Sequence, residues 1–258
     1  MLPWYGIGAS HQGLVRSTNQ DAFLVDNHAR LWAVADGMGG HPGGDVASRL
    51  VIDTLAEIAA REGSLLDGSA DETVASLRDM AESAHRAILN HARLRPELLG
   101  MGTTLTGLHI SPQSCPTATI INEGDSRAYL WRHGILKQLT RDHSMVEEYV
   151  RQGLLSPEQA LRHPQRHVLS RAVGLGSEAD VDITTEPLEP DDILLLCTDG
   201  LTKMIDDERL ATALSDYSST PEALTRALVS AALEAGGHDN VTVVVVYAQS
   251  QTRGGKIH

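Results

Sequence analysis

LWAVADGMGGHPGGDVAS, residues 31–48, joins an apolar run to a glycine-rich loop. The run from Leu31 to Ala35 is typical of a buried strand, because it is short and uninterrupted. It stops at Asp36, and five of the eight residues that follow are glycine. Glycine lets a backbone turn sharply or approach a ligand closely. The stretch therefore predicts an aspartate at the carboxyl end of a strand, beside a loop built for close contact.

The spacing of these glycines excludes two kinds of phosphate-binding loop. A Walker A loop needs a lysine after its last glycine, but Gly44 is followed by Asp45. A dinucleotide-binding loop that began at Gly37 would need glycine at the position of Pro42. The loop is therefore not predicted to hold a nucleotide.

The composition is that of a globular protein with an acidic excess. The 258 residues suffice for one large domain or two small ones, and we favour one. Hydrophobic residues make up 41% of the chain and charged residues 21%, which excludes disorder over most of it. Asp and Glu number 34 against 21 Lys and Arg, a formal net charge of −13. Such a field repels nucleic acids and anionic membranes, so neither is predicted as a partner.

The cysteines and the apolar segments indicate a cytoplasmic location. Cys115 and Cys197 lie far apart, and two reduced thiols are a simpler interpretation than one long-range disulfide. The first residues lack the pattern of a signal peptide. No segment approaches the roughly 20 apolar residues that a membrane-spanning helix needs.

Hydrophobic periodicity predicts helices and strands of a layered fold. Apolar residues recur at helical spacing in 44–62, 71–93 and 221–235. The strand-like runs are Ala22–Val25, Leu31–Ala35, Thr103–Ile110, Thr117–Ile121, Ser126–Arg132, Ile193–Thr198 and Val241–Ala248. Several of these runs are apolar on both faces and need cover on both sides. They predict a sandwich of sheets flanked by helices.

Two segments differ from this pattern. From about 140 to 175 the sequence consists of charged helical pieces, and SPEQ at 156–159 forms a capping box that opens a short helix. We interpret this segment as an insertion near the site that the loops build. Residues 249–258 are polar and are expected to form a flexible tail after a single domain over 1–248.

The junction at Asp36 is echoed later in the chain. In DDILLLCTDG an apolar strand again ends in Asp-Gly, at Asp199. In HDNVTVVVV the order is inverted, because Asp239 precedes the apolar strand. If this last strand is antiparallel to the other two, its start lies beside their ends and the three carboxylates converge on one rim. Asp21 in RSTNQDA and Asp125 in NEGDSRA are candidates for the same rim.

A cluster of carboxylates requires positive charge. Two unit charges about 4 Å apart repel by roughly 4 kcal/mol at an effective dielectric constant near 20, while a fold is only ~5–15 kcal/mol stable. Ligation by aspartate, backbone carbonyl and water suits Mg²⁺ or Mn²⁺, whereas zinc sites prefer His and Cys. Gly37 has no side chain, so its carbonyl can approach a metal ion.

Paired ions of this kind suit a reaction at phosphorus. Two ions ~3.5–4 Å apart can share a water, lower its pKa toward neutrality and direct it at a phosphorus atom. Arg16, five residues before Asp21, is the candidate for binding the phosphate, because a guanidinium can grip two phosphate oxygens at once.

Eight motifs follow one another along the chain: RSTNQDA, VADGMGGHPGGDVAS, MGTTL, EGDSRAYLWRHG, DHSMV, HVLSRAVG, LLLCTDGLTKMI and HDNVTVVVV. In this order they resemble the metal-dependent serine/threonine protein phosphatases of type 2C, in their bacterial form. The similarity extends from about residue 7 to 247. Eight ordered motifs are far more specific than a single Asp-Gly pair.

The resemblance implies an α+β fold, a four-layer αββα sandwich with two mostly antiparallel sheets and a dinuclear Mn²⁺ or Mg²⁺ site. By position, Asp36 would bridge both ions and Gly37 would give its carbonyl to one of them. Asp199 and Asp239 would hold the other ion, and Asp21 would support the cluster through hydrogen bonds or water.

The resemblance also assigns the substrate side of the site. Arg16 would bind the substrate phosphate. Asp125 matches the position that, together with the equivalent of Asp199, holds a weaker third ion in related bacterial enzymes. The insertion at 140–175 matches the flap that shapes substrate access.

Two positions depart from the family pattern. Gln20 stands where many relatives have Glu, so one water-mediated metal contact loses its charge. Met38 stands where animal relatives carry a histidine proposed as general acid, and methionine cannot donate a proton. Three alternatives stay open: His41 takes over the role, a metal-bound water does, or no acid is needed.

From these residues we predict a protein-serine/threonine phosphatase, with Asp36 and Arg16 as catalytic residues. A hydroxide activated by two metal ions would attack phosphorus in line, without a phosphoenzyme. The expected partners are phosphorylated proteins and a cognate serine/threonine kinase whose action the monomeric enzyme reverses. Type VI secretion or envelope signalling is a pathway by analogy only. The rival hypotheses are a catalytically silent regulator that binds phosphoproteins and a phosphatase of a small phosphorylated metabolite.

Overall fold

Two five-stranded sheets form the centre of the protein. The computed structural model describes residues 4–38, 43–62, 68–113, 115–218 and 220–248. The first sheet has the order β1 (Trp4–His11), β10 (Val241–Ala248), β9 (Ile193–Cys197), β6 (Arg127–Arg132) and β7 (Ile135–Gln138). The second sheet has the order β2 (Asp21–Asp26), β3 (Leu31–Asp36), β4 (Leu105–Ile110), β5 (Thr117–Glu123) and β8 (Asp182–Pro187). Neighbouring strands in both sheets are antiparallel.

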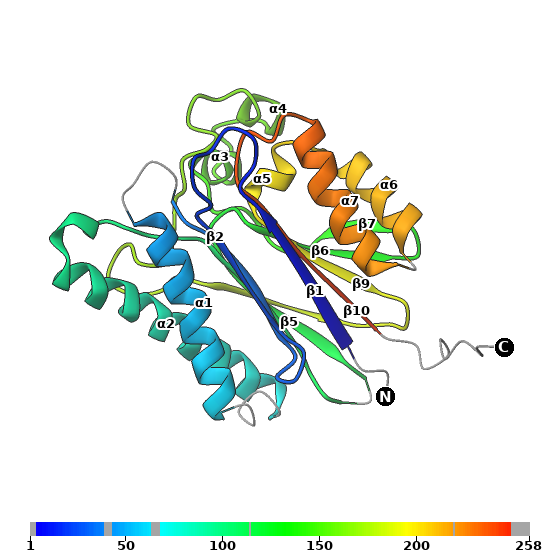
Figure 1. Ribbon diagram of the computed structural model, residues 1–258, viewed down its shortest axis with the longest axis horizontal. Helices are drawn as coiled ribbons and strands as arrows, with labels where there is room; N and C mark the ends of the chain where they lie inside the picture. Colours follow the sequence, from blue (N-terminus) through cyan, green and yellow to red (C-terminus); the bar gives the residue numbers. More distant parts are fainter. Residues whose placement is uncertain (1–3, 39–42, 63–67, 114, 219, 249–258) are drawn as a thin grey trace.

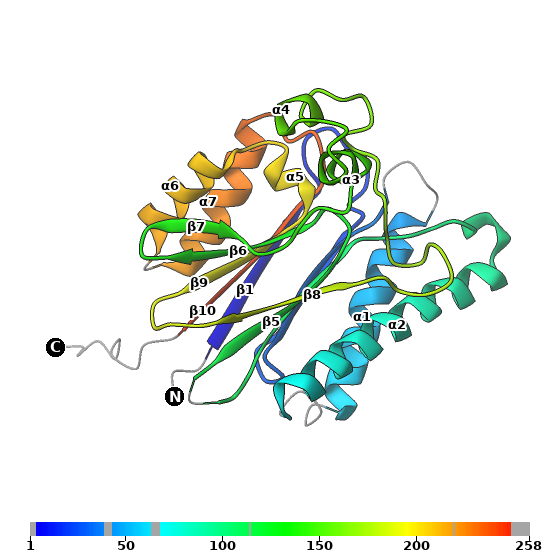
Figure 2. The ribbon, with the colours of Figure 1, turned by 180° about the vertical axis from the view of Figure 1, so that it is seen from behind.

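Helices cover the outer face of each sheet (Figures 1 and 2). The second sheet carries α1 (Gly44–Glu62) and α2 (Ala70–Leu94), whereas the first carries α6 (Asp207–Tyr217) and α7 (Pro221–Glu234). The shorter helical elements are the 3-10 turn Pro96–Leu98, α3 (Met145–Arg151), α4 (Pro157–Ala160) and α5 (Asp199–Thr202). The predicted α+β fold, a four-layer αββα sandwich, is confirmed.

The continuous apolar run of β3 reflects burial on both faces. Leu31, Ala33 and Ala35 pack into the core between the second sheet and its helices. Trp32 and Val34 point the other way, into the core between the two sheets. Successive side chains of a strand alternate between faces, so both faces of β3 are apolar where each packs into a core.

The long helices follow the predicted boundaries. Helices predicted over 44–62, 71–93 and 221–235 are observed as α1, α2 and α7. The predicted capping box at 156–159 is present, because Ser156 and Gln159 each bond to the other's backbone N–H at the start of α4. These elements are set by local side-chain chemistry and apolar spacing, which a sequence displays directly.

Several elements escaped sequence interpretation. The strand β1 contains two glycines, which weaken a strand pattern, but a Cβ at Gly6 would lie 2.1 Å from the Trp32 indole. A Cβ at Gly8 would lie 2.4 Å from the Phe23 ring. The glycines therefore make room for rings of the facing sheet. The strands β7 and β8 lie at sheet edges and are largely polar, and α6 follows directly after α5.

The segment 140–175 contains α3 and α4 and lies at one end of the sandwich (Figure 1). His41 and the predicted tail 249–258 lie outside the described residues. Within the described ranges, none of the helices has the length and apolar character to cross a membrane.

Candidate active site

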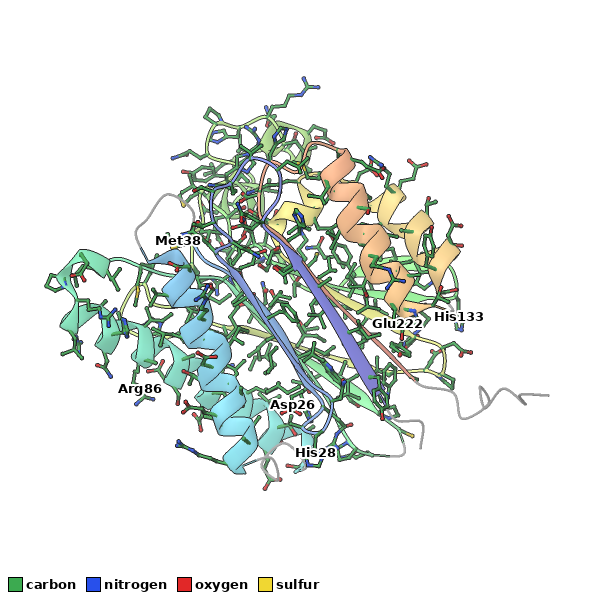
Figure 3. All side chains as sticks on the ribbon, in the orientation of Figure 1. Asp26, His28, Met38, Arg86, His133 and Glu222 are labelled. Carbon is green, nitrogen blue, oxygen red and sulfur yellow. The ribbon has the colours of Figure 1, made fainter. Side chains whose placement is uncertain are left out.

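The loops at one end of the sandwich surround an open cavity of about 720 Å³. Figure 3 places Met38, which follows β3, at this end, whereas Asp26 and His28 of the β2–β3 hairpin lie at the opposite end. Six of the residues predicted from sequence line the cavity: Arg16, Asp36, Gly37, Asp125, Asp199 and Asp239. The four aspartates among them and Asp21 make a group of five, which is called here the acid cluster.

Asp36 and Asp21 are brought together by the pairing of β2 with β3. Asp36 ends β3 and lies directly opposite Asp21, the first residue of β2. Like charges in such a cross-strand pair repel each other. Asp21 Oδ2 accepts hydrogen bonds from the hydroxyls of Thr198 (2.8 Å) and Thr242 (2.7 Å), which belong to the other sheet. The carboxylate of Asp21 is therefore held between the two sheets.

Asp125 lies in a turn that carries the chain from one sheet to the other. The turn follows β5 of the second sheet and precedes β6 of the first, so it is not a β-hairpin. Gly124 has a φ of 115°, a conformation that favours glycine. The hydroxyls of Ser126 and Thr104 lie 2.7 Å apart and fix the base of the turn. The crossing directs Asp125 to the cavity.

Asp199 and Asp239 meet because β9 and β10 are antiparallel neighbours. Asp199 follows the end of β9 and begins α5, whereas Asp239 precedes the start of β10. A Cβ at Gly200 would lie 1.8 Å from the carbonyl oxygen of Asn240, so the glycine lets the two segments touch. Asp36 ends β3, which belongs to the second sheet. The carboxylates converge across two sheets.

Burial and mutual repulsion raise the pKa values of three members of the acid cluster, Asp21, Asp36 and Asp125. Burial, followed by the charges of Asp21 and Asp199, raises the pKa of Asp36 well above its ordinary value. Burial raises the pKa of Asp21 to about 7, against hydrogen bonds that lower it. Burial and the charge of Asp199 raise the pKa of Asp125 to about 8. The cluster therefore favours protons or other cations over a set of bare carboxylates.

The donor set fits hard cations. The Oδ1 atoms of Asp21 and Asp199 are buried and have no hydrogen-bond partner. Buried polar atoms without a partner are rare in folded proteins and mark a site for an ion or water. In the described ranges, no three His, Cys, Asp or Glu side chains form a ready ligand group by themselves. A bound Mg²⁺ or Mn²⁺ would complete its oxygen ligands with carbonyls and water.

Packing by itself is enough to require glycine at position 37. A Cβ at this position would lie 2.1 Å from the carbonyl oxygen of Gly44 and 2.8 Å from that of Gln20. The Gly37 N–H donates to Gln20 O at 3.1 Å. No side chain fits here, and the Asp-Gly junction brings the start of α1 against the end of β3.

Two basic side chains reach the acid cluster. Arg16 Nη2 donates to Asp239 Oδ2 at 2.8 Å, and the Arg16 side chain is 41% exposed. Lys203 forms an ion pair with Asp199, and its Nζ lies 4.0 Å from Asp239 Oδ2. Sequence analysis missed Lys203, although it follows Asp199 by four residues within LLLCTDGLTKMI. This spacing places it on the same side of a helix as Asp199.

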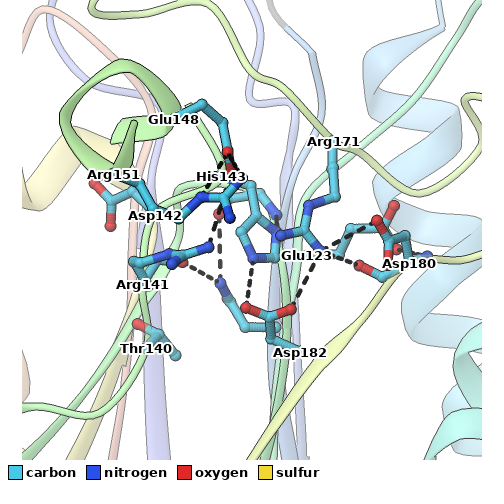
Figure 4. A network of polar contacts seen from close by, with 12 residues as sticks. Glu123, Thr140, Arg141, Asp142, His143, Glu148, Arg151, Arg171, Asp180 and Asp182 are labelled. Atoms are coloured by element: carbon cyan, nitrogen blue, oxygen red, sulfur yellow. Dashed lines mark hydrogen bonds and ion pairs between the residues drawn. The ribbon is translucent and has the colours of Figure 1, made fainter. Parts of the chain in front are cut away.

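One wall of the cavity comes from the segment after α4. It is lined there by residues 167–172, including Arg171, which belong to the insertion predicted at 140–175. Figure 4 shows Arg171 between the carboxylates of Asp180 and Asp182, and its Nη1 lies 3.2 Å from each of them. His143 Nε2 lies 3.1 Å from Asp182 Oδ2. This wall is held by ion pairs.

Further ion pairs lie near those of Arg171 (Figure 4). Arg127 makes two hydrogen bonds to Asp142, each of 2.8 Å. Arg151 donates to Glu148 at 2.9 Å, and Arg141 lies 3.8 Å from the same carboxylate. The arginine network is defined here as these pairs together with those of Arg171: Arg127, Arg141, Arg151, Arg171, Asp142, Glu148, Asp180 and Asp182.

Comparison with known proteins gives consistent relatives. The family model described as protein phosphatase 2C matches residues 7–235. The chain is 37% identical over 238 residues to the serine/threonine phosphatase stp of Listeria monocytogenes. This match covers 91% of this chain and 92% of that protein.

Solved structures agree with this match. PppA, a key regulatory component of T6SS in Pseudomonas aeruginosa, superposes with a TM-score of 0.79 at 38% identity, over 95% of this chain and 98% of that one. The catalytic domain of the serine/threonine protein phosphatase PstP in complex with two manganese ions superposes with a TM-score of 0.81 at 35% identity, over 97% of this chain and 100% of that one.

Proposed function

Because the chain belongs to the protein phosphatase 2C family, we propose that it hydrolyses phosphoserine and phosphothreonine in proteins with the help of divalent metal ions. The observation that carries this proposal is the acid cluster, in which burial raises the pKa values of Asp21, Asp36 and Asp125 and two buried carboxylate oxygens have no hydrogen-bond partner. The names of the relatives support the substrate class. The acid cluster faces an open cavity, which a protruding phosphorylated side chain can enter.

Two ions, Mn²⁺ or Mg²⁺, are proposed to bind the acid cluster. Asp36 would be shared by both ions, and Gly37 would offer its carbonyl to one of them. Asp199 and Asp239 would hold the other, and Asp21, fixed by its two threonine hydrogen bonds, would orient the cluster. When bound, the ions lower the pKa of a coordinated water toward neutrality and offset the charge of the phosphoryl group.

Arg16 is proposed to bind the substrate phosphate. Its exposed guanidinium lies at the cavity rim next to Asp239, where an incoming phosphate meets it. A planar guanidinium can donate two hydrogen bonds to phosphate oxygens and hold the group in one orientation. The role of His41 as proton donor stays a prediction, as do the cognate kinase, the flap and the cytoplasmic location.

Cys197 does not act as a nucleophile in this proposal. The side chain is fully buried in the core of the first sheet. Burial raises the pKa of its thiol to about 12, so no thiolate is available near neutral pH. A direct attack by water is therefore the route that the residues of the cavity support.

The proposal is tested by release of phosphate from a phosphothreonine peptide in Mn²⁺, with and without a chelator. We expect activity that chelation abolishes, and a roughly 10⁴-fold loss in Asp36→Asn, because metal ions contribute several kcal/mol to such reactions. Arg86→Ala, on the far side of α2, is the control and keeps full activity.

Other outcomes separate the rival hypotheses. A protein that binds the peptide but releases no phosphate in Mn²⁺ would be a silent regulator. Faster turnover of small phosphorylated metabolites than of peptides would make it a metabolite phosphatase. Activity that survives chelation would refute the metal-dependent proposal.

A further inference from the structure

Lys203 lies inside the candidate active site without a role in the proposed reaction. It follows α5 directly, and its N–H donates to Asp199 O at 2.8 Å. This backbone bond places the side chain one turn after Asp199, so that it returns along the helix to the carboxylate of that residue. The Lys203 side chain is only 29% exposed and lines the cavity.

The ammonium group engages one oxygen of Asp199 and leaves the other free. Lys203 Nζ contacts Asp199 Oδ2. Asp199 Oδ1 is buried and has no hydrogen-bond partner. A carboxylate that serves ions on two sides needs both oxygens. Asp199 therefore has one oxygen left for a metal ion.

Lys203 also lies in the same cavity as Asp125. The cavity is lined by Asp125, Asp199 and Lys203, and the ammonium group of Lys203 is paired with Asp199. Asp125 and Asp199 are the pair to which sequence resemblance assigns a weak third ion. In this chain a lysine pairs with one of these two residues and lines the same cavity as the other.

We propose that the Lys203 ammonium replaces the third metal ion, so that the site binds two divalent ions and excludes a third from Asp125 and Asp199. This inference rests on the proposed function, because it assumes that two ions occupy the rest of the acid cluster. It gives Lys203 the role of a positioning residue, which holds the Oδ2 side of Asp199 and leaves Oδ1 to the metal ions.

The balance of formal charge supports two ions. With all five carboxylates of the acid cluster deprotonated, as metal ligands must be, the two basic side chains that reach them, Arg16 and Lys203, leave three negative charges in the described part of the site. Two divalent ions more than offset this excess. A third would add two further charges beside an ammonium that already occupies one of its ligand oxygens.

The test counts bound ions instead of measuring turnover. Mn²⁺ is titrated into chelator-treated, desalted protein and followed by isothermal titration calorimetry and by electron paramagnetic resonance of free Mn²⁺. We expect two ions per chain in the wild type and in Lys203→Arg, and a gain of one ion in Lys203→Met. Lys137→Met is the matched control, since Lys137 pairs with Glu186 far from the cavity, and it keeps two ions.

A second variant shows where the extra ion binds. Adding Asp125→Asn to Lys203→Met is expected to return the count to two, because the third ion depends on that carboxylate. Circular dichroism of each metal-free variant confirms that it is folded. Three ions in the wild type, or two in a folded Lys203→Met, would overturn the proposal.

Phosphate release from the phosphothreonine peptide is measured in parallel. If the wild type binds two ions but shows no turnover, the proposed function fails and the inference about Lys203 stands. If turnover is metal-dependent and three ions bind, the inference fails and the proposed function stands.

Discussion

The acid cluster and the arginine network place acidic residues side by side, but they neutralise them differently. In the arginine network, four carboxylates are matched by four arginines. Figure 4 labels three of these arginines, Arg141, Arg151 and Arg171. The acid cluster contains five carboxylates, which share only Arg16 and Lys203 among the described residues. Arg171 and Asp180 of the arginine network line the same cavity as the acid cluster, but the network is more exposed: the side chains of Asp180 and Asp182 are 69% and 46% exposed, against 12% for Asp199.

The pKa values follow this contrast. The hydrogen bond from Arg151 lowers the pKa of Glu148 in the arginine network. Burial raises the pKa of Asp36 in the acid cluster, and neighbouring carboxylates raise it further. The comparison shows that this chain pairs acids with guanidinium groups where they support a wall. Where acids are left underpaired, burial and repulsion favour protons or added cations.

The largest effect expected from this contrast is a pH-dependent loss of stability in the metal-free protein. The raised pKa values of Asp21 and Asp125, about 7 and 8, mean that the folded state holds protons that the unfolded chain has lost. Such a group favours folding below its unfolded pKa near 4, and this contribution is lost as the pH rises to the folded value. One group changes the free energy of unfolding by about 1.4 kcal/mol per pH unit, or about 4 kcal/mol over three units.

We therefore expect the Tm of chelated protein to fall between pH 5 and pH 8, as measured by circular dichroism. Saturating Mn²⁺ is expected to flatten the curve, because the ions replace the protons. Asp125→Asn is the matched variant and reduces the slope by about one proton. A metal-free Tm that is constant or rises over this range would contradict the contrast.

Much of this arrangement could be predicted from sequence. The apolar run Leu31–Ala35 marks a strand that is buried on both faces, and the repeat of Asp-Gly after Asp36 and Asp199 marks the site. Both signals are local, because burial and chain reversal leave a pattern within a few residues. The convergence of the acids on one rim of the sandwich was inferred from strand direction, and in the structure these acids come from both sheets.

What could not be predicted depends on contacts between distant segments. Asp21 is held by Thr198 and Thr242, which lie 177 and 221 residues away along the chain. The two glycines of β1 argue against a strand when the sequence is considered alone. In the structure the rings of Trp32 and Phe23 occupy the space that their side chains would need. At such positions packing between the two sheets outweighs the low strand propensity of glycine. The hydrophobic periodicity of the sequence does not show this packing.

A smaller effect is expected when one pair of the arginine network is broken. Arg127→Met leaves the carboxylate of Asp142, which is 21% exposed, without the guanidinium that binds both of its oxygens. Removing one partner of a largely buried pair costs about 3 kcal/mol of the free energy of unfolding, measured by urea denaturation. Metal ions are not expected to restore it.

Two controls make this result specific. Asp142→Leu added to Arg127→Met is expected to recover part of the loss, because no unpaired charge is left. Arg86→Ala breaks an exposed pair with Glu82 on α2 and changes stability by only about 0.3–0.5 kcal/mol. A loss in Arg127→Met that Mn²⁺ reverses would mean that the network is part of the metal site.

The smallest effect concerns Arg16, the basic residue of the acid cluster that is proposed to serve the substrate. Because its side chain is 41% exposed, Arg16→Ala is expected to change the metal-bound stability little. The loss of two charge-assisted hydrogen bonds to the phosphate is expected to lower kcat/KM by roughly 10²-fold. Arg16→Lys keeps a point charge without the planar fork and is expected to recover about tenfold of it. If kcat/KM stays unchanged while the metal-free Tm falls, Arg16 neutralises Asp239 and does not bind substrate.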